Sequence, residues 1–120
     1  IHALFKNQDE RLDAKQRIME LGDLSISDSM GTNLEINAPG VNKGMGLIQL
    51  GRLLGIEREE IMACGDGNND LMMLKEVGFG VAMANGADEV KEVADYITLS
   101  NEEDGVAAAI EKFVLNPERG

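Results

Sequence analysis

The chain has 120 residues, 43% of them hydrophobic, which suits one small domain with a packed core. Its formal net charge of −11 repels nucleic acid and anionic membranes, so both are excluded as expected partners. A single cysteine, Cys64, and a single histidine, His2, exclude an internal disulfide and zinc sites rich in cysteine or histidine. No apolar run approaches the ~20 residues that span a bilayer, and no secretory leader is recognisable, so a reduced cytoplasmic setting is expected.

The first part of the chain is weakly patterned. Short strands are expected at Ile1–Phe5, Leu24–Met30 and Asn33–Asn37, the last with Leu34 and Ile36 on one face. Between the first two, Asp9–Leu21 predicts a polar helix whose inner face is formed by its apolar residues, Leu12, Ile18, Met19 and Leu21.

After Pro39-Gly40, apolar runs alternate with helical segments. The first helix is expected over Lys43–Leu54, with Gly55 as a left-handed C-cap. Such alternation is typical of βαβ units, so we predict an α/β fold with a partial Rossmann-like parallel sheet and flanking helices, separated from the first part near Asn37–Val41. The expected strands are Ile61–Cys64, Phe79–Ala84 and Tyr96–Leu99, and the later helices are Leu71–Val77, Ala87–Ala94 and Asp104–Val114.

The strongest chemical signal is the sequence Gly-Asp-Gly-Asn-Asn-Asp at Gly65–Asp70, directly after an expected strand. Ligands bind beyond the carboxyl ends of strands in open parallel sheets, and Asp66 and Asp70 are hard oxygen ligands that suit Mg²⁺. The alternative is a simple turn, because all these residue types favour turns. An EF-hand is excluded, since the twelfth position counted from Asp66 is Val77 and not glutamate.

A second candidate is Lys43, which stands at the start of an expected helix. A cation there opposes the helix dipole, so its position suggests a role as a phosphate-binding cation, with a solvated surface lysine as the alternative. Cys64, which is flanked by apolar residues, is interpreted as a core thiol and not as a nucleophile.

Together these motifs resemble the C-terminal half of haloacid dehalogenase-superfamily phosphatases, in particular the Cof-like branch that acts on sugar phosphates. The resemblance covers about residues 33–115. It rests on Asn-Lys-Gly at 42–44, on Gly-Asp-Gly-Asn-Asn-Asp-Leu-Met-Met-Leu at 65–74, and on the segments 80–86, 92–98 and 101–107. It implies that residues 1–32 are the C-terminal remnant of an α/β cap domain and that residues 33–120 form the C-terminal half of the core.

The resemblance also implies a mechanism. An aspartate nucleophile attacks the phosphorus of a small phosphorylated metabolite, such as a sugar phosphate, and water hydrolyses the resulting aspartyl-phosphate. Mg²⁺ neutralises the phosphoryl oxygens. In this scheme Lys43 pairs with the phosphate, Asp66 is a direct metal ligand, Asp70 holds a metal-bound water or supports the site, and Asn69 lies beside the phosphate.

The sequence departs from the family in lacking the Asp-x-Asp-Gly-Thr motif that carries the nucleophile. Asp28 is a poor substitute, and the Ser or Thr of the second family motif is not distinguished among Ser25, Ser27, Ser29 and Thr32. With its start at Ile1, the chain is expected to be part of a longer protein and to be inactive alone. It is also expected to pair with the missing half, or with itself, through an exposed sheet edge.

Two other functions fit parts of the pattern. The phosphorylation domain of a P-type ion pump shares Gly-Asp-Gly-x-Asn-Asp, but the continuation Met-Met-Leu and the lack of membrane helices oppose it. A non-catalytic metal-binding or regulatory module derived from the same fold is the alternative from a different class. An Asp-x-Asp-Gly-Thr segment preceding Ile1 would favour the enzyme.

Overall fold

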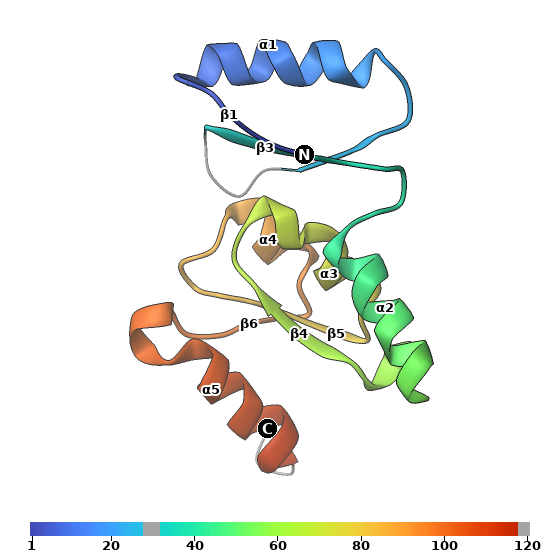
Figure 1. The fold of residues 1–120 in the computed structure, drawn as a ribbon. Helices are drawn as coiled ribbons and strands as arrows, with labels where there is room; N and C mark the ends of the chain where they lie inside the picture. The colour runs from blue at the N-terminus through green and yellow to red at the C-terminus, as the bar shows by residue number, and fades with distance from the viewer. Residues whose placement is uncertain (28–31, 118–120) are drawn as a thin grey trace.

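The structure, a computed structural model, describes residues 1–27 and 32–117 and has two lobes, each built on its own three-stranded sheet (Figure 1). The lobes are joined by residues 38–42. The Cα radius of gyration is 16.0 Å, with principal extents of 50 × 34 × 19 Å. A compact domain of this length would have a radius of about 14 Å, so the elongation reflects the two-lobed shape.

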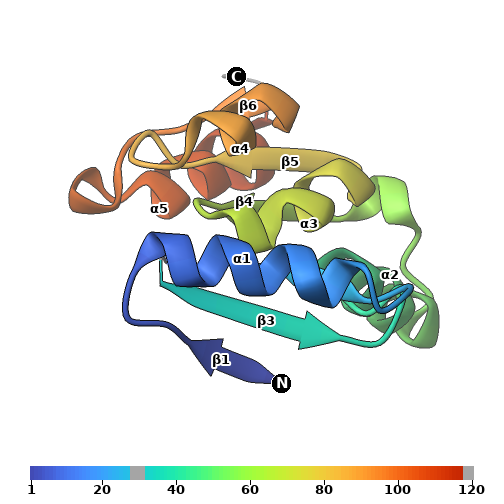
Figure 2. The same ribbon diagram turned by 90° about the horizontal axis from the view of Figure 1, so that it is seen from above.

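The first lobe contains β1 (His2–Leu4), α1 (Gln8–Met19), β2 (Ser25–Ser27) and β3 (Asn33–Asn37). The sheet is antiparallel with the order β1-β3-β2, and α1 lies across one of its faces (Figure 2). The Asn7 side chain caps α1 by accepting a hydrogen bond from the Glu10 amide at 2.9 Å, as the start of a helix requires. All four elements lie where the sequence predicted them, within a few residues.

The structure corrects one detail of the sequence-based interpretation of this lobe. The expected inner face of α1 is wrong for Leu12, Met19 and Leu21, which are exposed, while Arg11 is buried. Positions 11, 14, 15 and 18 share one helical face, and the polar Arg11 occupies it, which apolar periodicity could not reveal. β3 hydrogen-bonds to β1 and β2, so residues 33–37 belong to the first sheet, while the division into a cap remnant, residues 1–32, and a core half, residues 33–120, stays a prediction.

The second lobe is a parallel sheet, as predicted, and its strand order is β4-β5-β6. Its second and third strands are shorter than expected, and the final helix is a short α-helix that continues as a π-helical segment over Glu111–Leu115. In order, the elements are α2 (Lys43–Leu54), β4 (Met62–Gly65), α3 (Leu71–Glu76), β5 (Phe79–Ala82), α4 (Asp88–Val93), β6 (Tyr96–Ile97) and α5 (Gly105–Ile110).

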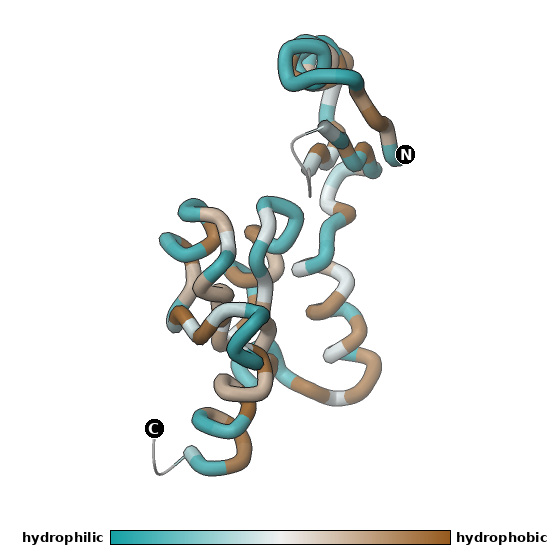
Figure 3. The backbone as a smooth tube through the Cα atoms, turned by 90° about the vertical axis from the view of Figure 1, so that its left-hand side faces the viewer, coloured by the Kyte–Doolittle hydropathy of each residue, from teal (hydrophilic) through white to brown (hydrophobic). Residues whose placement is uncertain are grey.

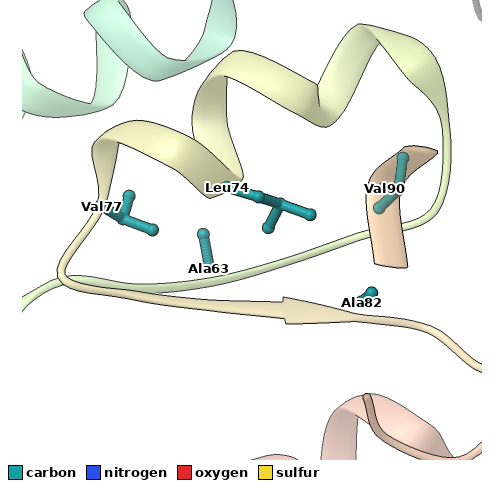
Figure 4. Packing of buried hydrophobic residues seen from close by; sticks show 5 residues of the cluster. All are labelled: Ala63, Leu74, Val77, Ala82 and Val90. Atoms are coloured by element: carbon teal, nitrogen blue, oxygen red, sulfur yellow. The ribbon is translucent and has the colours of Figure 1, made fainter. Parts of the chain in front are cut away.

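Helices cover both faces of this parallel sheet, as parallel sheets require (Figures 1 and 4). On one face, Leu74 and Val77 at the α3 end and Val90 of α4 pack against Ala63 and Ala82 of the strands (Figure 4). On the other, the aromatic rings of Phe79, Tyr96 and Phe113 form a cluster with centroid separations of 4.7 and 4.8 Å. This core fixes the carboxyl ends of β4 and β5, where the candidate site lies.

Close packing of α2 against α3 depends on Gly44. A Cβ built on Gly44 would lie 2.7 Å from the Met72 carbonyl oxygen, whereas one on Gly46 meets nothing within 4 Å. Gly44→Ala is therefore expected to lower the free energy of unfolding by about 1–3 kcal/mol, as overpacking does. Gly46→Ala, in the same helix, is expected to raise it by up to about 1 kcal/mol. Urea denaturation of both variants checks this, and equal effects would contradict the packing argument.

Candidate active site

The loop after β4 is organised around the carboxylate of Asp70. This side chain is buried, and its Oδ2 accepts hydrogen bonds from the backbone amides of Asp66 at 3.0 Å and Gly67 at 3.2 Å. Its Oδ1 accepts a hydrogen bond from Lys43 Nζ at 2.7 Å. Both oxygens are therefore engaged, and Asp70 holds the loop in a tight turn through Asn68–Asp70.

These contacts determine the charge state of Asp70. Burial raises the pKa of the carboxyl, but the hydrogen bonds from Lys43 and from the Asp66 and Gly67 amides outweigh it, and the net pKa lies below its ordinary value of 3.8. A carboxyl with a depressed folded-state pKa contributes stability above its unfolded pKa, and this contribution is lost as the pH falls through the folded-state value. Asp70 is therefore an anion at neutral pH, and the loop loses its anchor only in acid.

Asp66 has a fixed backbone and a free side chain. Its amide donates to Asp70, and its carbonyl accepts from the Ala87 amide at 2.9 Å. Its side chain is exposed, and its carboxylate has no hydrogen bond or ion pair with any residue that the structure describes. The backbone of Asp66 is thus fixed at the carboxyl end of β4, and its exposed carboxylate is available to bind a cation.

Lys43 is the first residue of α2, after the N-cap Asn42, whose side chain accepts from the Met45 amide at 2.9 Å. The Lys43 side chain is half-exposed and pairs with Asp70, 27 positions along the chain. It is thus neither a simple solvated lysine nor an isolated cation. The ion pair offsets its unfavourable place at a helix N-terminus and directs its ammonium group to the loop.

A cavity of about 470 Å³ opens between the two lobes beside this pair. The residues that line it from the second lobe include Lys43, Lys75, Asn68 and Asn69 together with the apolar Leu71 and Met72, whereas Asp66 is not among the lining residues. The structure therefore brings together Lys43, Asp70 and Asn69 of the predicted set, with Asp66 on the same loop. From the first lobe it adds four polar residues, namely Ser25, Ser27, Glu35 and Asn37.

The remaining predicted residues have varied outcomes. Asp28 and Ser29 lie outside the described residues. Ser25 and Ser27 line the cavity, and Thr32 is exposed. Burial raises the pKa of the Cys64 thiol, which agrees with its interpretation as a core thiol, because a nucleophile needs a lowered pKa.

Sequence reasoning missed Glu35 and Asn37, although their period-two alternation with Leu34 and Ile36 could have marked a second, polar face.

Within residues 1–27 and 32–117, no three side chains of the usual ligating types come close enough to hold a metal ion by themselves. Asp66, with one free carboxylate, still fits Mg²⁺ as a partial set, because Mg²⁺ typically takes one or two carboxylates and completes its shell with water and phosphate oxygens. The described helices also include none long and apolar enough to cross a membrane.

A parallel sheet with a carboxylate-bearing loop after one strand and a lysine directed to that loop offers both an anionic and a cationic group at the place where open parallel sheets bind ligands. The model of the haloacid dehalogenase-like hydrolases matches residues 1–110. The chain therefore belongs to the haloacid dehalogenase-like hydrolase family. This confirms the family resemblance and the α/β fold predicted from the sequence.

Known proteins of this family are similar to the chain in sequence and in structure. A 5-amino-6-(5-phospho-D-ribitylamino)uracil phosphatase of Bacillus subtilis, YcsE, is 46% identical over 111 residues, which is 92% of this chain and 45% of the relative. A solved haloacid dehalogenase-like hydrolase from B. subtilis has a TM-score of 0.86 at 34% identity, covering 94% of this chain and 39% of its own. A solved subclass IIB sugar phosphatase has a TM-score of 0.81 at 33% identity, covering 86% and 40%. The chain thus spans less than half the length of these relatives.

Proposed function

We propose that this chain supplies the lysine and the metal-binding carboxylate of a Mg²⁺-dependent phosphatase that acts on small phosphorylated metabolites. The observation that carries the proposal is the Asp70 anchor. It fixes the backbone of Asp66 while leaving the Asp66 carboxylate free, and it holds Lys43 at the same loop. The relatives named as phosphatases of a ribityl phosphate and of sugars support this class of substrate.

Each residue has a distinct task in this proposal. Asp66 would hold Mg²⁺, which supplies positive charge to the phosphoryl oxygens when bound. Lys43 places a second positive charge at the phosphate, and Asn69 adds a neutral hydrogen-bonding side chain at the same end of the cavity. Asp70 acts through these groups, because its own oxygens are engaged by Lys43 and by two backbone amides.

The proposed reaction proceeds through an aspartyl-phosphate, so it also needs an aspartate nucleophile. The sequence contains no Asp-x-Asp-Gly-Thr motif. We propose that another polypeptide segment provides this motif and pairs with the parallel sheet described above. On this proposal the 120-residue chain alone hydrolyses no p-nitrophenyl phosphate. A chain that does so, and loses the activity on Asp66→Asn, would overturn this part of the proposal.

The test is a chimera in which this chain replaces the 111-residue segment of B. subtilis YcsE that aligns with it. The chimera is expected to hydrolyse p-nitrophenyl phosphate, and the hydrolysis is expected to stop when Mg²⁺ is chelated. Asp66→Asn should abolish tight Mg²⁺ binding in titration calorimetry and lower kcat/KM by at least about 10²-fold, because it removes a hard anionic ligand. Asp70→Asn should weaken Mg²⁺ binding less, because it acts indirectly.

A folded chimera without Mg²⁺-dependent hydrolysis would contradict the proposal and favour the alternative of a non-catalytic module. Circular dichroism establishes that the chimera is folded. Glu102→Gln, which neutralises an exposed carboxylate in the turn before α5, serves as the matched control and should leave activity unchanged.

A further inference from the structure

The face of the first sheet that is turned away from α1 is polar. In the β2–β3 ladder, Ser25 pairs with Asn37 and Ser27 with Glu35, and side chains two residues apart share a face. These four side chains therefore project from the same side of the sheet. The intervening pair, Ile26 and Ile36, alternates toward the side of the sheet on which α1 lies (Figure 2), although Ile26 also contributes to the cavity wall.

This polar face lines the cavity across from Lys43 and Asn69. All four of its side chains are partly buried. A partly buried face built from hydroxyl, amide and carboxylate groups is poorly suited to packing but well suited to hydrogen-bonding a polar ligand. The cavity volume, about 470 Å³, is in the range of small-molecule sites.

Glu35 is the only carboxylate among the described residues that line this cavity. Its Oε2 accepts a long hydrogen bond from Ser27 Oγ at 3.4 Å, and no described residue donates a hydrogen bond to its Oε1. An ionised carboxylate can only accept hydrogen bonds, so it favours ligands that offer hydroxyl hydrogens and repels ligands that carry a negative charge at the same place.

We propose that Glu35 is a specificity-determining residue that selects phosphomonoesters with a hydroxyl-rich leaving group and rejects those with a carboxylate there. The phosphate of such a ligand lies at Lys43 and the Asp66 loop, while its hydroxyl groups donate to Glu35 and exchange hydrogen bonds with Ser25 and Asn37. This inference rests on the proposed function, because it needs the phosphate end to be fixed at that loop.

The test is an amide NMR titration of the ¹⁵N-labelled 120-residue chain in the presence of Mg²⁺. Three probes are used, namely inorganic phosphate, sorbitol 6-phosphate and 2-phosphoglycolate. Phosphate is expected to shift the amides of Lys43 and residues 66–69 only, and sorbitol 6-phosphate is expected to shift residues 25–27 and 35–37 as well. Sorbitol 6-phosphate should bind about tenfold more tightly than 2-phosphoglycolate, the effect of a hydrogen bond to a charged group.

Glu35→Gln keeps the shape of the side chain and removes its charge. It should reduce the preference for sorbitol 6-phosphate about tenfold and leave the affinity for inorganic phosphate unchanged, whereas Glu102→Gln should change neither. If phosphate shifts the loop but the two organic phosphates bind equally well, or Glu35→Gln leaves their ratio unchanged, only the role of Glu35 is overturned. If phosphate fails to shift the loop, the proposed function falls as well.

Discussion

Lys43→Ala, introduced into the YcsE chimera, is expected to lower kcat/KM by about 10²–10³-fold while the protein remains folded. Removing a fixed cation from the place where charge develops in a phosphoryl-transfer transition state costs about 2–4 kcal/mol, by analogy with oxyanion-stabilising donors. The effect on folding should be smaller, because the Lys43 side chain is half-exposed and Asp70 keeps its two backbone amide donors. Steady-state kinetics and thermal melting on the same samples check both expectations.

Two further variants distinguish a role of Lys43 in catalysis from a general effect of charge. Arg52→Ala removes one positive charge from the other end of α2, where the side chain is exposed, and should leave kcat/KM unchanged. Lys43→Arg keeps the charge but replaces a compact ammonium with a planar guanidinium, so it should restore activity only in part. If Lys43→Ala has the kcat/KM of the unmodified chimera, the lysine is an ordinary helix-surface residue whose ion pair is merely structural.

The second lobe could be predicted from the sequence because local signals coincide with the fold there. Lys43–Leu54 is helical over the expected residues, with Asn42 as its N-cap and Gly55 at a φ of 73° as its left-handed C-cap. Both ends are determined by side-chain and backbone preferences of single residues. The apolar runs became strands for a similar reason, since short runs bounded by glycine and polar loops have few alternatives.

The contacts of the site could not be predicted, because they join residues far apart in the chain. The pairing of Lys43 with Asp70 depends on the close approach of α2 to α3, which Gly44 permits. Asp66 and Asp70 are the same residue type in the same loop, and the carboxylate of Asp66 is free only because it is the Asp70 side chain that turns inward. No periodicity records that choice, so the residue types alone gave both as metal ligands. Their different tasks came only from the family resemblance and remain a proposal.

The polar face around Glu35 was missed for a related reason. Sequence reasoning about β3 followed the apolar residues Leu34 and Ile36, which indicate a core, and assigned no role to the alternate residues. The strand β3 lies at the boundary between the two lobes, so its polar side lines a cavity and does not face open solvent. The same limitation explains the misassigned face of α1, where Arg11 is buried and Leu12 is exposed.

The open edge of β4 is expected to make the isolated 120-residue chain self-associate. β4 pairs with β5 on one side and with no other described strand. The carbonyls of Ile61 and Gly65 accept from the Phe79 and Met83 amides on that side, so the backbone groups of Met62 and Cys64 point to the unpaired edge. The strand contains no charge and no proline, the devices that protect natural edges.

An apolar groove of about 280 Å³ lies next to the start of this edge and includes Met62. The helix α2 contributes Leu50 and Leu54, which are 50% and 65% exposed, and brown, apolar segments recur along this helix in Figure 3. An open strand edge beside exposed apolar side chains favours association with another strand, whether from the segment that carries the nucleophile or from a second copy of the chain.

Sedimentation velocity measures the self-association that the open β4 edge predicts. The unmodified chain is expected to show a sedimentation coefficient that rises with concentration, and Met62→Lys, which puts a charge on the edge strand, is expected to shift it toward the monomer. Met19→Lys is the matched control, because it makes the same substitution at a 60% exposed site on α1 in the other lobe, and it should leave the association unchanged. A folded, monodisperse monomer at high concentration would show that the β4 edge needs no partner.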